Sequence, residues 1–333
     1  MDAGAFATMS FIMGEFELIN SYFKRPARRA VLGGGDDCAL IAPSPGQQLA
    51  ISTDMLVEGR HFLPTVHPER LGHKALAVNL SDLAACGAKP MAFTLALSLP
   101  RADKIWAEAF SRGLYRLAEE HGCELIGGDT TQGPLNICIT VFGEVAPEQA
   151  LLRQSAEPGD DVYISGQVGE ARMALEVFRG QLSLSEQAFE RCRQRMELPT
   201  PRVALGLALR GIANAAIDVS DGLLGDLGHI LQRSGVGAQI ETRWLEGSPA
   251  TGPDLLSLGW SRRLDMAMAG GDDYELLFTA PRALRERVHA AGHDVGVALT
   301  RIGEITEQAG LRLLDPQGQP LLRRFASFDH FAS

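Results

Sequence analysis

The sequence predicts a two-domain protein of the α/β or α+β class. Its 333 residues exceed what one ordinary core needs and suit two domains of roughly 150 residues each. Stretches with the period of a strand and stretches with the period of a helix alternate in both halves, which is typical of sheets packed against helices in layers. The pattern weakens over residues 147–159. We therefore predict an N-terminal domain over residues 13–150 and a C-terminal domain over residues 151–333.

The periods of the apolar residues place the individual elements. In the first half they predict helices over residues 14–23, 68–85 and 104–122, and strands over 38–42, 48–53, 93–99, 124–126 and 135–145. Glycine-rich loops are expected at 33–37 and 127–133. In the second half they predict strands over 161–165 and 215–219 and one that 272–278 leads into, and helices over 169–179, 184–196, 223–233 and 282–291.

The composition is that of an ordinary globular protein, with 45% hydrophobic and 22% charged residues. A net charge of −10 disfavours nucleic-acid binding, although divalent metals would still allow phosphate ligands. No apolar run predicts a membrane span, and no signal peptide is recognisable. The five cysteines include no C-x-x-C pair, which indicates the reducing cytoplasm. Residues 1–12 precede a plausible start at Met13 and are expected to lie outside the fold.

The main chemical signal is a set of aspartates at strand ends and in glycine-rich loops. Magnesium prefers hard oxygen ligands and often combines carboxylates with substrate phosphates. A glycine beside an aspartate lets the backbone approach a phosphate closely. A lone Gly-Asp pair is more often a solvated turn, but its repetition beside Ser or Thr favours a metal and phosphate site. The aspartates are Asp36, Asp37, Asp54, Asp82, Asp129, Asp218, Asp221, Asp272 and Asp273.

Asp82 lies at the edge of the apolar stripe of its predicted helix. The stripe consists of Leu76, Leu80 and Leu83, and an unpaired charge beside it is costly unless a metal or a cation compensates it. A surface aspartate at a helix edge is an equally good interpretation.

Residues 215–222 are predicted to form a strand that runs into the start of a helix. Ser220 or Asp221 would serve there as an ordinary N-cap. Asp218 alternates with apolar neighbours and points to the opposite face of the strand. Three polar side chains at one strand end suit a metal and phosphate site better than a cap alone.

Several familiar catalytic motifs are absent. The sequence contains no G-x-x-x-x-G-K-[ST] loop, no Rossmann glycine motif and no G-x-S-x-G elbow. His289 and His293 have the spacing of two metal ligands on one helix. Gly292 is expected to end that helix between them, so a solvated helix end is the preferred interpretation.

The ordered motifs resemble those of the thiamine-monophosphate kinases. They are GDDCAL at residues 35–40, STDMLVEGRHF at 52–62, HKALAVNLSDLAACGAKP at 73–90, GGDTTQG at 127–133, AIDVSDGL at 216–223, GGDDYEL at 270–276 and FDHF at 328–331. No single motif would suffice. The set follows in the expected order and covers residues 14–331, which makes the resemblance specific.

The resemblance implies a two-domain fold like that of aminoimidazole-ribonucleotide synthetase. It implies a homodimer whose N-terminal domains join their sheets, with ATP bound near the interface. It also implies ATP-dependent phosphorylation of thiamine monophosphate with several magnesium ions. No residue would act as general base, because the acceptor phosphate is itself the nucleophile.

Site residues are implied by the same resemblance. Magnesium would be held by Asp37, Ser52, Thr53, Asp54, Asp82, Asp129, Asp218 and Asp221, with Asp54, Asp82 and Asp129 assisting the transfer. ATP would be contacted by Gly128, Asp129, Arg153 and Ser220. Thiamine monophosphate would be contacted by His61, Asp272 and Phe328.

Two alternatives stay open at this point. Another ATP-dependent enzyme of the superfamily, such as a purine-pathway or selenophosphate synthetase, would share the fold. Residues 28–32 lack the lysine expected of the latter, and the purine enzymes lack the long 73–90 match. A non-catalytic ATP and magnesium sensor would keep the motifs but would release no ADP.

Overall fold

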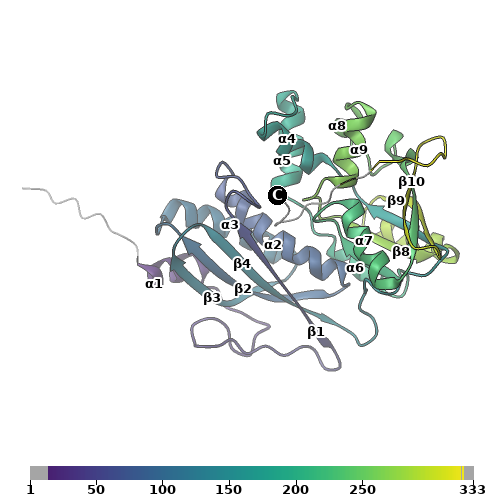
Figure 1. Cartoon of the computed structure of the whole chain (residues 1–333). Helices are drawn as coiled ribbons and strands as arrows, with labels where there is room; N and C mark the ends of the chain where they lie inside the picture. Colours follow the sequence, from purple (N-terminus) through teal and green to yellow (C-terminus); the bar gives the residue numbers. More distant parts are fainter. Residues whose placement is uncertain (1–13, 324, 326–333) are drawn as a thin grey trace, which may run out of the picture.

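The computed structural model describes residues 14–323 and 325. They form two sheets with helices packed on them (Figure 1). The strand order is β1-β4-β2-β3 in the first sheet and β10-β7-β9-β5-β8-β6 in the second. This confirms the predicted class. Residues 1–12 and Phe328 lie outside the described residues. No helix of the described part of the chain is both long and apolar enough to cross a bilayer.

The first sheet is covered by helices on one face (Figure 1). A short helix α1 (Glu15–Leu18) and a π-helical turn (Ile19–Phe23) come first. They are followed by β1 (Gln48–Val57), α2 (Pro68–Ala85), β2 (Lys89–Leu99), α3 (Lys104–Glu120), β3 (Glu124–Gln132) and β4 (Asn136–Val145). Strand β4 pairs antiparallel with β1 and β2, whereas β2 and β3 are parallel. The edge strand β1 and helix α2 are the parts that later form the site.

Two expectations for the first half are wrong. Residues 38–42 form no strand, and only Leu40 makes a bridge, to Leu32. The apolar residues of that segment instead pack as a loop against the sheet beside Met91. Residues 127–133 are not a loop, because β3 continues through them to Gln132. Gly128 allows this continuation, since a Cβ there would lie 1.9 Å from the Leu95 carbonyl oxygen of β2.

The second half contains more elements than the sequence predicts. It consists of β5 (Asp160–Ser165), α4 (Glu170–Phe178), α5 (Glu186–Glu197), α6 (Val203–Ala208), β6 (Ala215–Asp218), α7 (Leu223–Ser234), β7 (Gly237–Glu241), a 3-10 turn (Thr242–Glu246), α8 (Pro253–Leu256), α9 (Trp260–Ala269), β8 (Leu276–Pro281), a 3-10 turn (Arg282–Leu284), α10 (Arg285–Asp294), β9 (Leu299–Thr306) and β10 (Gly310–Leu314). Helices α6, α8 and α9 and strands β7, β9 and β10 were not predicted.

The expected helix end at Gly292 is also wrong, because helix α10 continues to Asp294. A Cβ at Gly292 would lie 2.8 Å from the Val297 carbonyl oxygen, so this glycine serves a close packing contact inside the helix. His289 and His293, which have the spacing of two metal ligands, therefore lie on one continuous helix.

Helix α2 joins the two halves. Its buried residues belong to a hydrophobic cluster that also contains Leu205, Leu276 and Phe278 from the second half. Helix α2 contacts α6 and β6 as well as its own sheet. The core therefore runs across the predicted boundary near residue 150, and that boundary stays a prediction.

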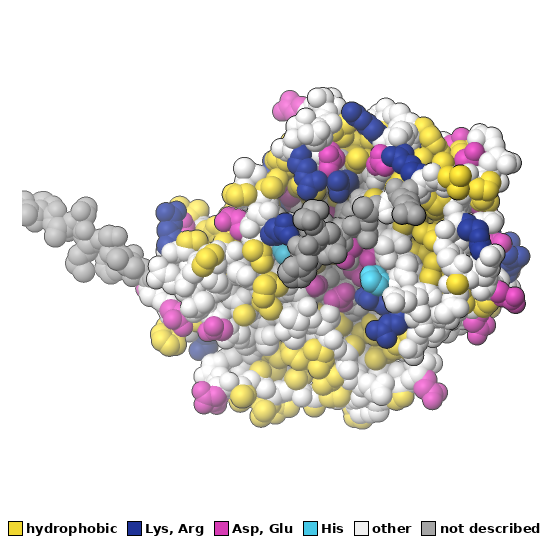
Figure 2. All heavy atoms as spheres, in the orientation of Figure 1, with side chains coloured by type: hydrophobic (Ala, Val, Ile, Leu, Met, Phe, Trp, Pro, Cys, Tyr) yellow, Lys and Arg dark blue, Asp and Glu magenta, His cyan; other side chains and the backbone are white. Residues whose placement is uncertain are grey.

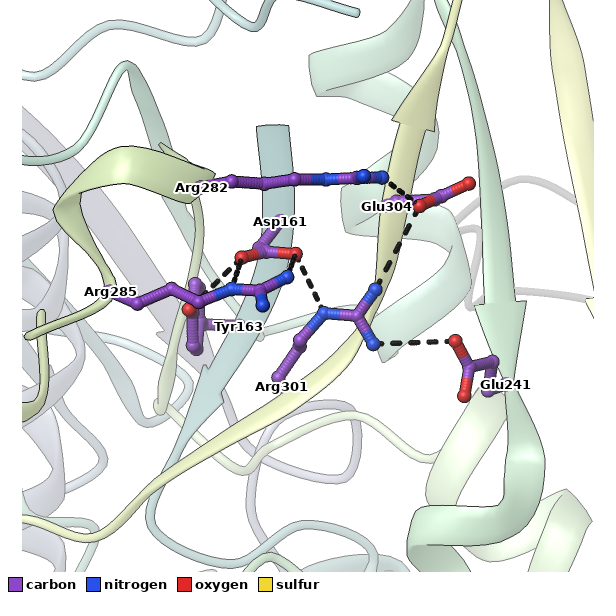
Figure 3. Close-up of polar contacts among 7 residues, drawn as sticks. All are labelled: Asp161, Tyr163, Glu241, Arg282, Arg285, Arg301 and Glu304. Carbon is purple, nitrogen blue, oxygen red and sulfur yellow. Dashed lines mark hydrogen bonds and ion pairs between the residues drawn. The ribbon is translucent and has the colours of Figure 1, made fainter. Parts of the chain in front are cut away.

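An ion cluster around one buried aspartate fastens α10 to the middle of the second sheet (Figure 3). The fully buried Asp161 of β5 accepts hydrogen bonds from Arg285 Nε at 2.5 Å and from Arg301 Nε at 2.6 Å. Tyr163 donates its hydroxyl to the same carboxylate, and Arg301 reaches on to Glu241 of β7. A buried carboxylate is stable only with such partners. The cluster thus has a structural role in the sheet.

Candidate active site

A cavity of about 480 Å³ is lined by residues of both halves. Figure 2 shows acidic and histidine side chains on the face between the halves, with arginine and lysine side chains around them. The walls come from β1, α2, the segment after β1, α4, the end of β6 and residues 271–274. The sequence-predicted residues that line it are Asp54, His61, Asp82, Asp218, Ser220, Asp221 and Asp272.

Strand β1 directs Ser52 and Asp54 toward helix α2. Alternate residues of a strand point to opposite faces, and these two lie on the helix-covered face. Ser52 Oγ donates a short hydrogen bond to an oxygen of Asp82. The backbone N–H of Asp54 donates to Asn79 Oδ1 at 3.1 Å, which satisfies a donor of this edge strand. Two segments distant in sequence thereby present carboxylates to one cavity.

Asp218 completes this group from the second half. It ends strand β6, is only 4% exposed, and accepts a hydrogen bond of 2.8 Å from Ser81 Oγ. Ser81 and Asp82 are neighbours in α2, so one turn of this helix contacts both Asp218 and Ser52.

The proximity of these carboxylates alters their acidity. Burial, followed by the charges of Asp82 and Asp221, raises the pKa of Asp54 to about 6. Burial, then the charge of Asp82, raises the pKa of Asp218 to about 8. Burial also raises the pKa of Asp82, against the opposing hydrogen bond from Ser52. A cation among these carboxylates would relieve this repulsion.

The turn after β6 is ordered by an aspartate that the sequence did not single out. Asp226, in the first turn of α7, accepts the backbone N–H groups of Ser220, Asp221 and Gly222 at 3.1, 3.2 and 3.1 Å. It thus satisfies backbone donors at the start of α7. The N-cap of α7 is Gly222, so neither Ser220 nor Asp221 is the N-cap, and both of these residues line the cavity.

His61 and Asp272 reach the cavity from different halves. The ring nitrogen Nδ1 of His61 accepts the backbone N–H of Val57 at 2.9 Å, which fixes the imidazole beside β1. Asp272 lies in the segment between α9 and β8 and forms an ion pair of 2.5 Å with Lys74 of α2. The two predicted substrate contacts in the described residues therefore share one cavity.

Other predicted residues lie on the opposite face of the first sheet. Thr53 points away from α2 and hydrogen-bonds Thr140 at 2.8 Å between hydroxyl oxygens. Asp129 shares this uncovered face, because it is in register with the exposed Ala96. Strand β3 is separated from β1 by two strands, which corresponds to about 14 Å at the usual strand spacing. Within one chain, Asp129 and Asp54 therefore cannot bind the same ion directly.

The remaining predicted residues are more peripheral. Asp37 is exposed in the loop that precedes β1, and in that loop Gly34 lies against the backbone of Ile126 and Gly127 in β3. Gly128 is also in β3. Arg153 is exposed, but its charge lowers the pKa of Asp82, so it lies within electrostatic reach of the cavity.

Sequence reasoning missed several residues of the cavity and its support: Lys74, Asn79, Ser81, Tyr274 and Asp226. A signal existed for Lys74. It follows Leu71 by three residues and precedes Val78 by four, so it lies on the apolar face of α2. A lysine there needs a partner.

Comparison with known proteins matches both halves of the chain to one family. The N-terminal domain family of AIR synthase related proteins matches residues 35–145, and the corresponding C-terminal domain family matches residues 148–315. The thiamine-monophosphate kinase of Salmonella typhimurium is 44% identical over 325 residues, which cover 96% of this chain and 99% of the relative.

Solved structures give the same result. The thiamine-monophosphate kinase of Stenotrophomonas maltophilia superposes with a TM-score of 0.82 and 43% identity, over 90% of this chain and 96% of that one. AaThiL complexed with AMPPCP and TMP superposes with a TM-score of 0.73 and 30% identity, over 87% and 89% of the two chains.

Proposed function

Because the chain belongs to the thiamine-monophosphate kinase family of AIR synthase related proteins, we propose that it transfers the terminal phosphoryl group of ATP directly to the phosphate of thiamine monophosphate. The observation that carries this proposal is the shared cavity, in which the carboxylates of Asp54, Asp82, Asp218 and Asp221 meet two predicted substrate contacts. A related structure holds AMPPCP and TMP, which correspond to the two substrates.

The transfer needs no proton acceptor on the protein. A phosphate monoester has a second pKa of about 6, so the acceptor is mostly a dianion at neutral pH. One of its oxygens attacks the terminal phosphorus of ATP. The bond from that phosphorus to the bridging oxygen breaks, and ADP leaves with the electron pair. The protein has to align the two anions and offset their repulsion.

The donor set fits magnesium. Among the described residues no group of three or more His, Cys, Asp or Glu is arranged to hold a metal by itself. Magnesium does not need such a cage, because it commonly takes one or two carboxylates together with waters and substrate phosphates. The carboxylates of Asp54 and Asp82, the hydroxyl of Ser52 and the nearby Asp218 and Asp221 supply hard oxygen donors. When bound there, magnesium would neutralise charge on the transferring phosphates.

The lining of the cavity suits both parts of the acceptor. Phe62, Val66, Leu175 and Met196 provide an apolar lining for an aromatic ring. His61 and Asp272 would hold that ring, whereas the phosphate would point to the acidic group. Ser220 and Arg153 would meet the phosphates of ATP.

A homodimer is part of the proposal. The uncovered face of β1 presents Leu49, Ile51 and Met55, which are 38%, 60% and 52% exposed. Contiguous apolar exposure of this kind typically marks an interface. Thr53 and Asp129 lie on the same face, so a second copy packed there would bring ATP and its metal close to the interface. The five cysteines are free thiols, in keeping with a cytoplasmic protein.

The test is ADP release from the purified protein with ATP and magnesium. We expect turnover with thiamine monophosphate, none with free thiamine, and none in the presence of a chelator. Asp54→Asn should lower kcat by roughly 100-fold or more, because it removes a charge that acts on the transferring group, while Asp294→Asn at the exposed end of α10 should not. Magnesium-dependent ATP binding without ADP release would instead support a sensor.

A further inference from the structure

Lys74 is a buried cation whose partner comes from the other half of the molecule. Its side chain is 3% exposed, and Nζ lies 2.5 Å from Asp272 Oδ2 across 198 residues of sequence. A buried ammonium without a counter-charge is strongly disfavoured. The pair therefore connects helix α2 of the first half to the segment between α9 and β8 at the wall of the cavity.

Asp272 is held in an unusual backbone conformation. Its φ is 72° and that of Tyr274 is 51°, in the left-handed region that non-glycine residues rarely adopt. The N–H of Asp272 donates to the Ser220 carbonyl and that of Tyr274 to the Val219 carbonyl, both at 2.8 Å. The segment is thereby fixed to the turn after β6. Backbone strain maintained in this way is typical of functional sites.

The two partners differ in what a ligand can reach. The side chain of Asp272 is 31% exposed, against 3% for Lys74. Lys74 and the side chain of Tyr274 each hydrogen-bond the Asp272 carboxylate. Because the two oxygens of a carboxylate offer about four acceptor sites, Asp272 can still accept a hydrogen bond from a molecule in the cavity. A ligand in the cavity would thus contact Asp272, with Lys74 behind it.

We propose that Lys74 is a positioning residue, which fixes the orientation of the Asp272 carboxylate so that it accepts a hydrogen bond from an amine-bearing aromatic ring in the cavity. This inference rests on the proposed function, since the aminopyrimidine of thiamine monophosphate is such a ring. Lys74 acts through Asp272 and does not bind the acceptor phosphate. It sets the affinity for the acceptor and leaves ATP binding unaffected.

The experiment is a double-mutant cycle of Lys74→Met and Asp272→Asn, with Lys104→Met at an exposed position as the control. Each single variant should raise the KM for thiamine monophosphate by about tenfold or more, as expected for a lost charge-assisted hydrogen bond, and leave the KM for ATP within about twofold. The double variant should match Asp272→Asn alone, because a residue acting through Asp272 has nothing left to position.

Three results would overturn the inference. If the two increases in the KM for thiamine monophosphate multiplied in the double variant, Lys74 would contact the acceptor itself. Equal increases in both KM values would mean that the pair only supports the fold, as would a KM for thiamine monophosphate that Lys74→Met does not change. The same cycle, followed by calorimetric binding of thiamine monophosphate, needs no turnover. Binding without ADP release would therefore contradict the proposed kinase activity and leave the inference testable, whereas no binding by the wild type would contradict both.

Discussion

At the scale of single residues, the site brings together carboxylates whose pKa is raised. Asp218 is nearly inaccessible to solvent, and among the described residues only the Ser81 hydroxyl donates a side-chain hydrogen bond to it. Its pKa of about 8 results from burial and from the charge of Asp82. An unfolded chain returns this carboxyl to an ordinary pKa near 4. Asp218 therefore links folding stability to pH in the direction opposite to a salt-bridged aspartate.

The metal-free protein should lose stability as pH rises. Between about pH 4 and pH 8 the folded state retains a proton on Asp218 that the unfolded state has released, so the free energy of unfolding falls as the pH increases. In a chelator-containing buffer, Tm should drop by several degrees from pH 5 to pH 8. Asp218→Asn should flatten this slope, as measured by calorimetry.

Asp294→Asn is the matched control for that experiment, because Asp294 is exposed at the end of α10. The change of Tm with pH in Asp294→Asn should equal that of the wild type. If Asp218→Asn retained the full wild-type slope, the raised pKa assigned to Asp218 would be wrong.

At the scale of elements, α2 supplies three side chains to the wall of the cavity. Lys74, Val78 and Asp82 follow one another at intervals of four residues and line the cavity together. Ser81, next to Asp82, contacts the second half. The position of this helix therefore determines the site, and that position depends on how closely α2 packs on α3.

Two glycines allow this packing. A Cβ at Gly72 of α2 would lie 2.0 Å from the Phe110 carbonyl oxygen, and one at Gly113 of α3 would lie 1.8 Å from the Glu69 carbonyl oxygen. Backbone atoms cannot yield as a flexible side chain can. Gly113→Ala should thus destabilise the protein by about 1–3 kcal/mol or more, as overpacking does, in urea unfolding.

Gly228→Ala is the control within helix α7, where an added Cβ meets nothing within 4 Å. It should be neutral or stabilising by up to about 1 kcal/mol, because alanine has the higher helix propensity. Equal unfolding free energies for Gly113→Ala and the wild type would show that α2 and α3 can separate at little cost.

At the scale of the whole molecule, helices cover only one face of the first sheet. Helices α2 and α3 cover one face of the first sheet (Figure 1), and the apolar residues of β1 remain on the other. Strand β1 is also an edge strand, and in the described residues one of its sides pairs with no other strand. Both features favour association of two copies through this region.

Ile51→Glu should convert a dimer to a monomer, because it places a charge at the centre of the uncovered face. Light scattering after gel filtration should give the mass of one chain for the variant and twice that mass for the wild type. Ile105→Glu on α3 is the control, since Ile105 is 81% exposed and lies on the helical side. A wild-type protein with the mass of one chain would contradict the dimer.

Local patterns determined much of this protein. The periods of apolar residues identified α2, α3, α7 and several strands, since each element buries a face whose spacing is set by its own geometry. The motifs identified the acidic residues and the family, because metal and phosphate chemistry limits which residue types can serve. Elements of the second half with weaker patterns, such as β7 and α9, were missed.

Only the tertiary structure decided which of those residues meet. Strand alternation separates Thr53 from Ser52 and Asp54, but the packing of α2 decides which face becomes the cavity wall. The glycines of residues 127–133 predict a loop, but pairing with β2 keeps this segment in strand β3 as far as Gln132. Lys74 pairs with Asp272 because the core packs α2 against the second half. Contacts between distant residues depend on burial and counter-charge across the whole fold, and no local spacing in the sequence records them.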